Sequence, residues 1–167
     1  MSLQGDIDKV KTQNPLWKSN SRIIGRAGEM YCCRNMKCIE CNSSDWLECV
    51  TNERSKDQIC KTCNKKYQIK CKKITEKQYS ILMTNKIFKT IGAEYNTTLK
   101  SIEQEIDYVI ILYDKEYKIL GILHINSDNI NSDNIIPRNK LGPNARRAGW
   151  QGCNLIFKDF NCINSAF

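Results

Sequence analysis

The sequence is short of a residue on which several common classes of enzyme depend. It contains one histidine, His124, in 167 residues. One histidine is too few for nucleases that use a histidine base together with histidine metal ligands, and for multi-histidine metal sites generally. It also argues against most hydrolytic triads that depend on histidine. His124 follows an apolar run, where we expect an ordinary core or surface histidine. If the protein hydrolyses nucleic acid, the remaining chemistry is a metal site built from carboxylate and lysine.

Long apolar runs are also missing. The longest, YVIILY and ILGIL, are far shorter than the roughly 20 residues that cross a bilayer. The N-terminus, MSLQGDIDKVKTQ, is polar and contains acids, so no signal or transit peptide is visible. We therefore expect a cytoplasmic protein with reduced thiols and no membrane partner.

Positive charge and cysteine are present in excess. Lysine and arginine number 26 against 18 acidic residues, a formal net charge of +8. This balance favours a polyanionic partner, above all nucleic acid. The chain also has 10 cysteines. Without a signal peptide, metal binding is a better interpretation than disulfides for any subset with suitable spacing.

The hydrophobic pattern predicts one α/β domain with a mixed sheet over residues 19–167, after a polar lead-in at residues 1–18. The first helix is expected to begin at a cap on Ser19 or Ser21. The later expected elements are a strand at 65–73, a helix over 76–92 with Gly92 as its C-cap, and a hairpin of 107–114 with 117–125. The tandem NSDNINSDNI predicts a polar loop without chemistry.

Four cysteines form two Cys-x-x-Cys pairs, Cys38 with Cys41 and Cys60 with Cys63. Each pair supplies two thiolates from one turn, and this spacing is typical of a zinc ribbon. Four thiolates leave no open position for substrate, so Zn²⁺ here is expected to be structural. The alternative, four ordinary buried thiols, does not account for the spacing. The six cysteines without such a pattern are expected to pack as small apolar residues: Cys32, Cys33, Cys49, Cys71, Cys153 and Cys162.

A second candidate site is interleaved with the zinc pattern, in SKDQICKTCNKKYQIKCKK. Gln68 and Lys70 share one face of the expected strand, and a zinc-pinned turn would return Asp57 to Gln68. Asp57, the Gln68 amide oxygen and the Ile69 carbonyl can hold Mg²⁺ or Mn²⁺, with Lys70 beside the attacked phosphate. From spacing alone a solvated basic strand is the commoner explanation, because an acid before Gln-x-Lys often arises by chance.

A third candidate is the basic, glycine-rich segment NARRAGWQGCN. Arg146 and Arg147 suit phosphate oxygens or a guanine edge. Trp150 can stack on a base, wedge a base step or contact a methyl group. A basic loop with one buried tryptophan explains the same residues, and the pattern does not separate the two interpretations.

Together, ARRAGW-x-GCN, the two Cys-x-x-Cys pairs and Asp57 followed by Gln-Ile-Lys resemble the DpnI-like methyl-directed restriction endonucleases. The resemblance runs from about Ser19 to Asn154. It implies a PD-(D/E)xK restriction-endonuclease-like mixed sheet flanked by helices, with an embedded zinc ribbon at 38–63. It also implies a type II, metal-dependent deoxyribonuclease that cuts double-stranded DNA at adenine-methylated, GATC-like sites.

The resemblance also assigns roles. Asp57 falls on the family's metal-binding aspartate, Gln68 on its motif glutamate and Lys70 on its lysine, while the paired cysteines fall on its zinc ligands. The neutral Gln68 removes one negative charge, which should weaken cation binding. Glu29, in the first expected helix, is a candidate compensating carboxylate.

Three functions therefore stay open from the sequence. They are a methyl-directed endonuclease, a methylated-DNA-binding protein disabled for cleavage by Gln68, and a plain zinc-ribbon nucleic-acid-binding module. The chain ends at Phe167, and we expect no C-terminal winged-helix domain of the kind that DpnI-like enzymes carry. One site per chain implies a monomer that nicks each strand in turn, or a transient dimer.

Overall fold

The computed structural model describes residues 1–48, 57–90, 93–158 and 160–163. Its centre is a six-stranded mixed sheet in the order β1-β2-β3-β6-β7-β10. The strands are β1 (Trp46–Glu48), β2 (Gln58–Cys60), β3 (Lys66–Lys73), β6 (Asp107–Tyr113), β7 (Ile119–Ile125) and β10 (Asn161–Cys162). The β3 and β6 strands are parallel, and the other neighbouring pairs are antiparallel. The expected α/β class and mixed sheet are confirmed.

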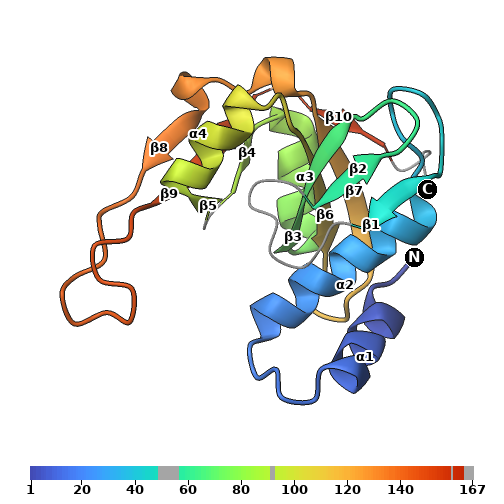
Figure 1. Cartoon of the computed structure of the whole chain (residues 1–167), viewed down its shortest axis with the longest axis horizontal. Helices are drawn as coiled ribbons and strands as arrows, with labels where there is room; N and C mark the ends of the chain where they lie inside the picture. Colours follow the sequence, from blue (N-terminus) through green and yellow to red (C-terminus); the bar gives the residue numbers. More distant parts are fainter. Residues whose placement is uncertain (49–56, 91–92, 159, 164–167) are drawn as a thin grey trace.

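Two helices cover one face of this sheet, α1 (Gln4–Gln13) and α2 (Asn20–Asn35) (Figure 1). The Ser19 side chain caps α2 by accepting the Arg22 N–H, as one of the two expected caps. Ile23, Ala27 and Tyr31 are buried at a spacing of four residues, which is the spacing of one helix face. They pack with Val109, Ile111 and Ile122 of the sheet in a first hydrophobic core.

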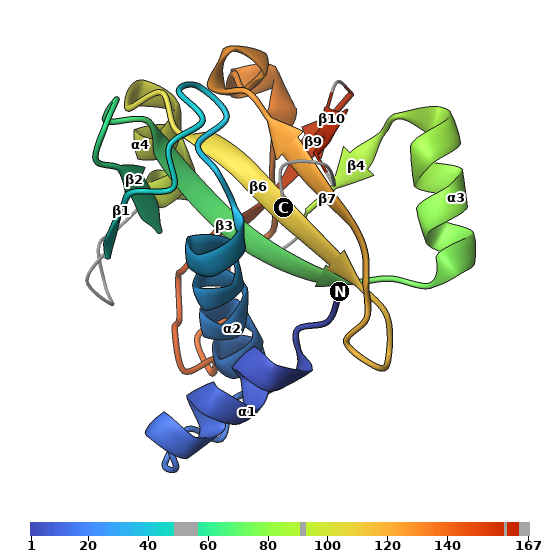
Figure 2. The ribbon, with the colours of Figure 1, turned by 90° about the vertical axis from the view of Figure 1, so that its right-hand side faces the viewer.

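The other face carries the remaining helices, α3 (Glu76–Asn85) and α4 (Tyr95–Glu103), and a smaller sheet (Figures 1 and 2). In that sheet β9 (Gly152–Phe157) pairs with β4 (Phe88–Lys89), β5 (Ala93–Glu94) and β8 (Ile135–Pro137). Leu155 and Phe157 pack with Tyr108, Ile110 and Leu123 in a second core. The β6 strand is buried along its whole length because it lies between both cores.

The expected strand at 65–73 and the hairpin of 107–114 with 117–125 are confirmed, as β3 and as β6 with β7. The helix expected over 76–92 is too long. It ends at Asn85, where Lys86 adopts a left-handed conformation with φ 54°, and Phe88 then pairs with Phe157 in β4. Tertiary pairing thus outweighs the helical pattern, and the expected cap at Gly92 lies outside the described residues.

Residues 1–18, expected as a polar lead-in, hold α1, and Leu3, Ile7 and Val10 are buried against the first core. The low overall hydropathy of this segment hid their helical spacing. The tandem NSDN repeat forms two one-turn 3₁₀ helices, η1 (Ser127–Asn129) and η2 (Ser132–Asn134). No helix in the described part of the chain is long and apolar enough to cross a membrane.

Candidate functional site

The two Cys-x-x-Cys pairs lie in turns of the same construction. The first follows α2, where the Asn42 N–H donates to the Cys38 carbonyl at 2.7 Å. The second follows β2, where the Asn64 N–H donates to the Cys60 carbonyl at 2.9 Å. Asn42 and Asn64 both adopt positive φ, at 59° and 60°, a conformation that asparagine tolerates better than most residues. The repeated Cys-x-x-Cys-Asn is the sequence signal for this shared turn.

These turns bring the four sulfur atoms together, all within 4.8 Å of one another. The Cys38 and Cys63 sulfurs are 3.5 Å apart, as are those of Cys41 and Cys60. Thiolates at the corners of a tetrahedron around zinc, with Zn–S bonds of about 2.3 Å, would be about 3.8 Å apart. The four-cysteine cluster therefore fits a structural zinc site, with thiolate sulfur as the donor at every corner.

The turn at the second pair also returns the chain so that Asp57 meets β3. Gln58 and Ile59 pair antiparallel with Tyr67 and Lys66, and the Asp57 N–H donates to the Tyr67 carbonyl at 2.9 Å. The Asp57 carboxylate then accepts two hydrogen bonds on Oδ2, from the Ile69 N–H at 2.7 Å and from the Gln68 side-chain amide. Asp57, Gln68 and Ile69 thus lie together, as the sequence predicts.

Gln68 is buried and Lys70 is exposed, although both project from the same face of β3. In this arrangement the Gln68 amide nitrogen is directed at Asp57. Gln68 must therefore turn its amide so that the oxygen faces a cation before it can serve as a ligand. A glutamate at this position would place a second negative charge beside Asp57 instead.

Burial raises the pKa of Asp57 to about 6, and the nearby Glu29 carboxylate adds to this rise. Lys70 and the hydrogen bonds from Ile69 and Gln68 oppose it by favouring the charged form. The loss of solvent around the partly buried Asp57 carboxylate thus outweighs the favourable charge of Lys70. A carboxylate with a strongly perturbed pKa is a candidate functional residue, and carboxylate oxygens are ligands that hard divalent cations prefer.

Glu29 lies across a small cavity of about 50 Å³ from Asp57. The cavity lining also includes Arg26, whose Nη1 is 2.8 Å from a Glu29 carboxylate oxygen. The Gln58 amide donates to the Glu29 backbone carbonyl at 2.9 Å and fixes β2 against α2. The structure therefore brings the compensating carboxylate suggested by the sequence to the same cavity as Asp57.

The segment with Arg146, Arg147 and Trp150 is a loop between β8 and β9 that projects from the body of the protein (Figure 1). Leu141 and Trp150 are joined by a backbone hydrogen bond of 2.9 Å near its base. Trp150 is 46% exposed, so the interpretation of this loop as one with a buried tryptophan is wrong. The Arg147 guanidinium carbon lies 4.3 Å from the centre of the Trp150 ring, and no loop residue lines the Asp57 cavity.

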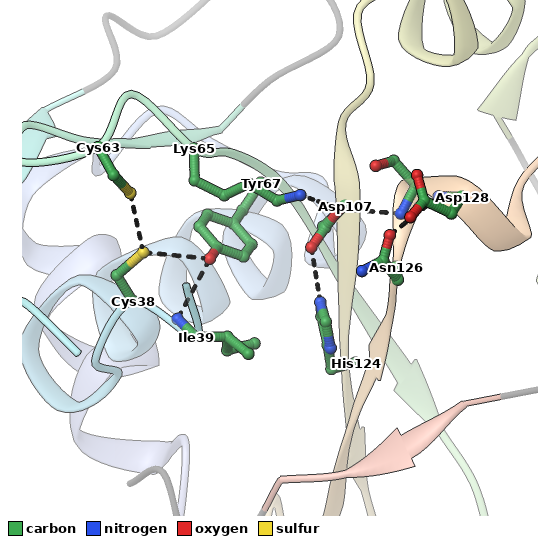
Figure 3. Close-up of polar contacts among 10 residues, drawn as sticks. Cys38, Ile39, Cys63, Lys65, Tyr67, Asp107, His124, Asn126 and Asp128 are labelled. Carbon is green, nitrogen blue, oxygen red and sulfur yellow. Dashed lines mark hydrogen bonds and ion pairs between the residues drawn. The ribbon is translucent and has the colours of Figure 1, made fainter. Parts of the chain in front are cut away.

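A buried polar cluster that the sequence does not predict adjoins the zinc turns (Figure 3). Asp107 accepts from Lys65 at 2.9 Å and from the Ser127 N–H at 2.8 Å, and it lies 2.7 Å from His124 Nε2. Burial favours the neutral acid, but these partners outweigh it and lower the pKa of Asp107. His124 is therefore a buried core histidine, one of the roles expected for it. The cluster draws on four separate segments, β6, β7, the turn before β3 and the turn after β7, so no local motif predicts it.

A comparison with protein-family models agrees with these observations. The model of DpnI, the Dam-replacing family, matches residues 2–163. The match takes in both cysteine turns, the Asp57–Lys70 segment and the projecting loop. A restriction endonuclease activity and DNA as a partner are what this family implies. The chain belongs to the DpnI, Dam-replacing family.

Proposed function

We propose that the protein is a Mg²⁺- or Mn²⁺-dependent type II endonuclease that cleaves double-stranded DNA at adenine-methylated, GATC-like sites. The observation that carries the proposal is the meeting of Asp57 with Gln68 and Ile69 at the edge of β3, next to Lys70. In the proposal, the Asp57 carboxylate is one cation ligand, and the Gln68 amide oxygen, once the amide has turned, and the Ile69 carbonyl are the others. These are the oxygen ligands that hard divalent ions prefer.

Each group has a distinct task in this proposal. Asp57 supplies the negative charge at the cation, which in turn lowers the pKa of a bound water and neutralises charge on the phosphate. Gln68 and the Ile69 carbonyl orient the cation without adding charge. Lys70, exposed on the same face as Gln68, donates to the attacking water or to a phosphate oxygen. Glu29 supplies a second carboxylate from α2.

The projecting loop is the proposed contact for methylated DNA. Arg146 and Arg147 suit phosphate oxygens, and the exposed Trp150 ring offers an apolar surface for a base or its methyl group. The net charge of +8 strengthens the attraction of DNA to the whole molecule.

One observation favours a second function, methylated-DNA binding without cleavage. The Gln68 amide donates to Asp57, so it occupies a lone pair that a cation would otherwise use. A protein that keeps this hydrogen bond would bind DNA and leave it intact. A plain zinc-ribbon module would explain the four cysteines but would leave the Asp57–Gln68–Ile69 arrangement without a role.

Digestion of plasmid DNA tests these functions. The chain and its Gln68→Glu variant are incubated with adenine-methylated and unmethylated GATC plasmid, in Mg²⁺ and in Mn²⁺. The proposal expects the unmodified chain to cut only the methylated plasmid, and Gln68→Glu to cut it faster because the cation site gains a charge. Cutting by Gln68→Glu alone would support the binding function instead.

Two controls make the result specific. Gln13→Glu adds the same charge at an exposed position of α1 and is expected to leave the cutting pattern unchanged. Lys70→Met should abolish cutting in either background while methylated-DNA binding persists. If neither the chain nor Gln68→Glu cuts either plasmid, the endonuclease function fails. If the chain also binds methylated and unmethylated plasmid with equal affinity, the binding function fails as well.

A further inference from the structure

Tyr67, the second residue of β3, lies between the cysteine cluster and Asp57. Its side chain has no exposed surface. Its hydroxyl oxygen is 3.3 Å from the Cys38 sulfur and accepts the Ile39 N–H at 3.2 Å. Figure 3 shows the ring directed from the strand toward Cys38. The Tyr67 side chain therefore contacts the first cysteine turn, although that turn is distant from Tyr67 in the sequence.

Zinc determines the direction of the hydrogen bond to Cys38. A zinc-bound thiolate carries no proton, so the sulfur can only accept. The Tyr67 oxygen already accepts from Ile39, which leaves its own O–H free to donate to the sulfur. Donors to a ligating atom fix the orientation of the ligand and commonly change metal affinity when they are removed.

The backbone of the same residue contacts the other site. The Tyr67 carbonyl accepts the Asp57 N–H at 2.9 Å. The next two residues of β3, Gln68 and Ile69, both donate to the Asp57 carboxylate. The position of Asp57 is thus defined by hydrogen bonds to three consecutive residues, beginning with Tyr67.

Neighbouring rings keep Tyr67 from moving independently of these contacts. The Trp46 ring meets it edge-on, with 5.7 Å between ring centres. Trp46 is held in turn by a 3.0 Å hydrogen bond from its Nε1 to the Met36 carbonyl. A displacement of Cys38 would therefore shift Tyr67 and, with it, the start of β3.

We propose that Tyr67 is a positioning residue that couples zinc occupancy of the four-cysteine cluster to the placement of Asp57. Its hydroxyl stabilises the Cys38 thiolate, and its backbone holds the Asp57 end of the β2–β3 hairpin. Loss of zinc, or of the hydroxyl, loosens the Asp57 hydrogen bonds before the rest of the sheet opens. The inference rests on the proposed function only for the metal-binding role of Asp57.

The first test measures zinc release from the Tyr67→Phe variant. Zinc-loaded chains are mixed with a chromophoric chelator, and the release rate is followed by absorbance. Loss of a ligand-orienting partner typically costs about 10- to 100-fold in metal affinity, so release should be at least about tenfold faster. Tyr113→Phe, which alters another buried tyrosine of the sheet, should release zinc at the rate of the unmodified chain. A Tyr67→Phe rate within about twofold of the unmodified rate would overturn the contact.

The second test follows hydrogen exchange of single backbone amides by NMR. The Asp57 and Ile69 amides should exchange about tenfold faster in zinc-loaded Tyr67→Phe, which corresponds to the loss of about one hydrogen bond. The Ile111 amide in β6 should be unchanged. Equal protection of Ile69 in the two proteins would overturn the coupling.

If Tyr67→Phe does not fold, the unmodified chain supplies the same test during slow chelation. The Ile69 amide should lose protection in step with zinc, ahead of Ile111. Simultaneous loss at both amides would overturn the proposal. Neither test involves DNA cleavage, so failure of the proposed endonuclease activity would leave both results interpretable.

Discussion

At the scale of single residues, the properties of Asp57 depend on its neighbours. Its carboxylate is partly buried and close to Glu29, and both effects raise its pKa, to about 6. Two hydrogen bonds and Lys70 limit the rise. Since a cation binds only the deprotonated form, proton and cation compete for the same carboxylate.

We expect Mn²⁺ binding to depend on pH through Asp57. Above the raised pKa of about 6, Asp57 is charged and affinity should be constant. Below it, protonation should weaken binding by about tenfold per pH unit, as for one competing proton. Calorimetric titration with Mn²⁺ between pH 5 and pH 8 measures this. An affinity that is constant through pH 6 would contradict the assignment of Asp57 as a ligand.

In the same experiment, the Glu29→Gln variant separates the effect of Glu29 on the pKa of Asp57 from its effect on cation affinity. Removing its charge should lower the pKa of Asp57, so the affinity plateau should extend to lower pH. At pH 8 the affinity itself should fall by about tenfold, because the cavity loses a carboxylate. A variant with the same midpoint and the same plateau would show that Glu29 has no part in the site.

At the scale of elements, the approach of α2 to β3 determines where Glu29 and Asp57 lie. Gly28 faces β3, and a Cβ at this position would be 2.2 Å from the Cys71 sulfur. Gly28 has an ordinary negative φ, so packing, and not backbone conformation, requires glycine. Gly25, three residues earlier in the helix, has no atom within 4 Å of the position of its missing Cβ.

These two glycines make a matched pair. Gly28→Ala should lower the free energy of unfolding by about 1–3 kcal/mol, as expected for overpacking. Gly25→Ala should raise it by about 0.5–1 kcal/mol through helix propensity. Urea denaturation of both zinc-loaded variants provides the comparison. Equal effects of the two substitutions would show that α2 does not approach β3 as closely as described.

Most elements that carry the site were predictable because their signals are local. The Ser19 cap, the alternation in β3, the β6–β7 hairpin and the cysteine spacing each occupy one short segment. α1, the end of α3 and the strand β9 were missed. Each depends on partners distant in sequence, such as Phe157 for Phe88. The Asp107–His124 cluster was missed for the same reason, and the metal-binding and catalytic roles of Asp57, Gln68 and Lys70 stay predictions.

At the scale of the whole molecule, the proposed binding of DNA combines general positive charge with one exposed loop. The net charge of +8 attracts any DNA and should make affinity depend strongly on salt. Trp150 and Arg147 contact each other, but their expected tasks differ. The aromatic ring can distinguish a methylated base, whereas the guanidinium binds phosphate on any sequence.

Two substitutions in the loop should therefore have different effects. Trp150→Ala should reduce the preference for methylated over unmethylated DNA by about tenfold, the lower end for loss of a methyl contact. Arg147→Ala should weaken binding to both DNAs alike. It should also reduce the slope of log affinity against log salt by about the amount that one phosphate contact contributes. Fluorescence anisotropy at several salt concentrations measures both.

Lys115→Ala provides the control for the second substitution, because it removes the same charge from the exposed turn between β6 and β7. Its binding should match that of the unmodified chain. If Trp150→Ala keeps the full methyl preference, another part of the protein must recognise the methyl group.

The tandem repeat between β7 and β8 has a consequence for how this connection can vary in length. Each copy closes its own turn, with Asn126 accepting the Asp128 N–H and Asn131 accepting the Asp133 N–H. Each also ends in a buried isoleucine, Ile130 or Ile135. Each copy is also tied to the rest of the fold, the first by the Ser127 N–H on Asp107 and the second by Ile135, which pairs with Leu155 of β9. Loss of either five-residue copy would therefore remove an anchor as well as shorten the connection.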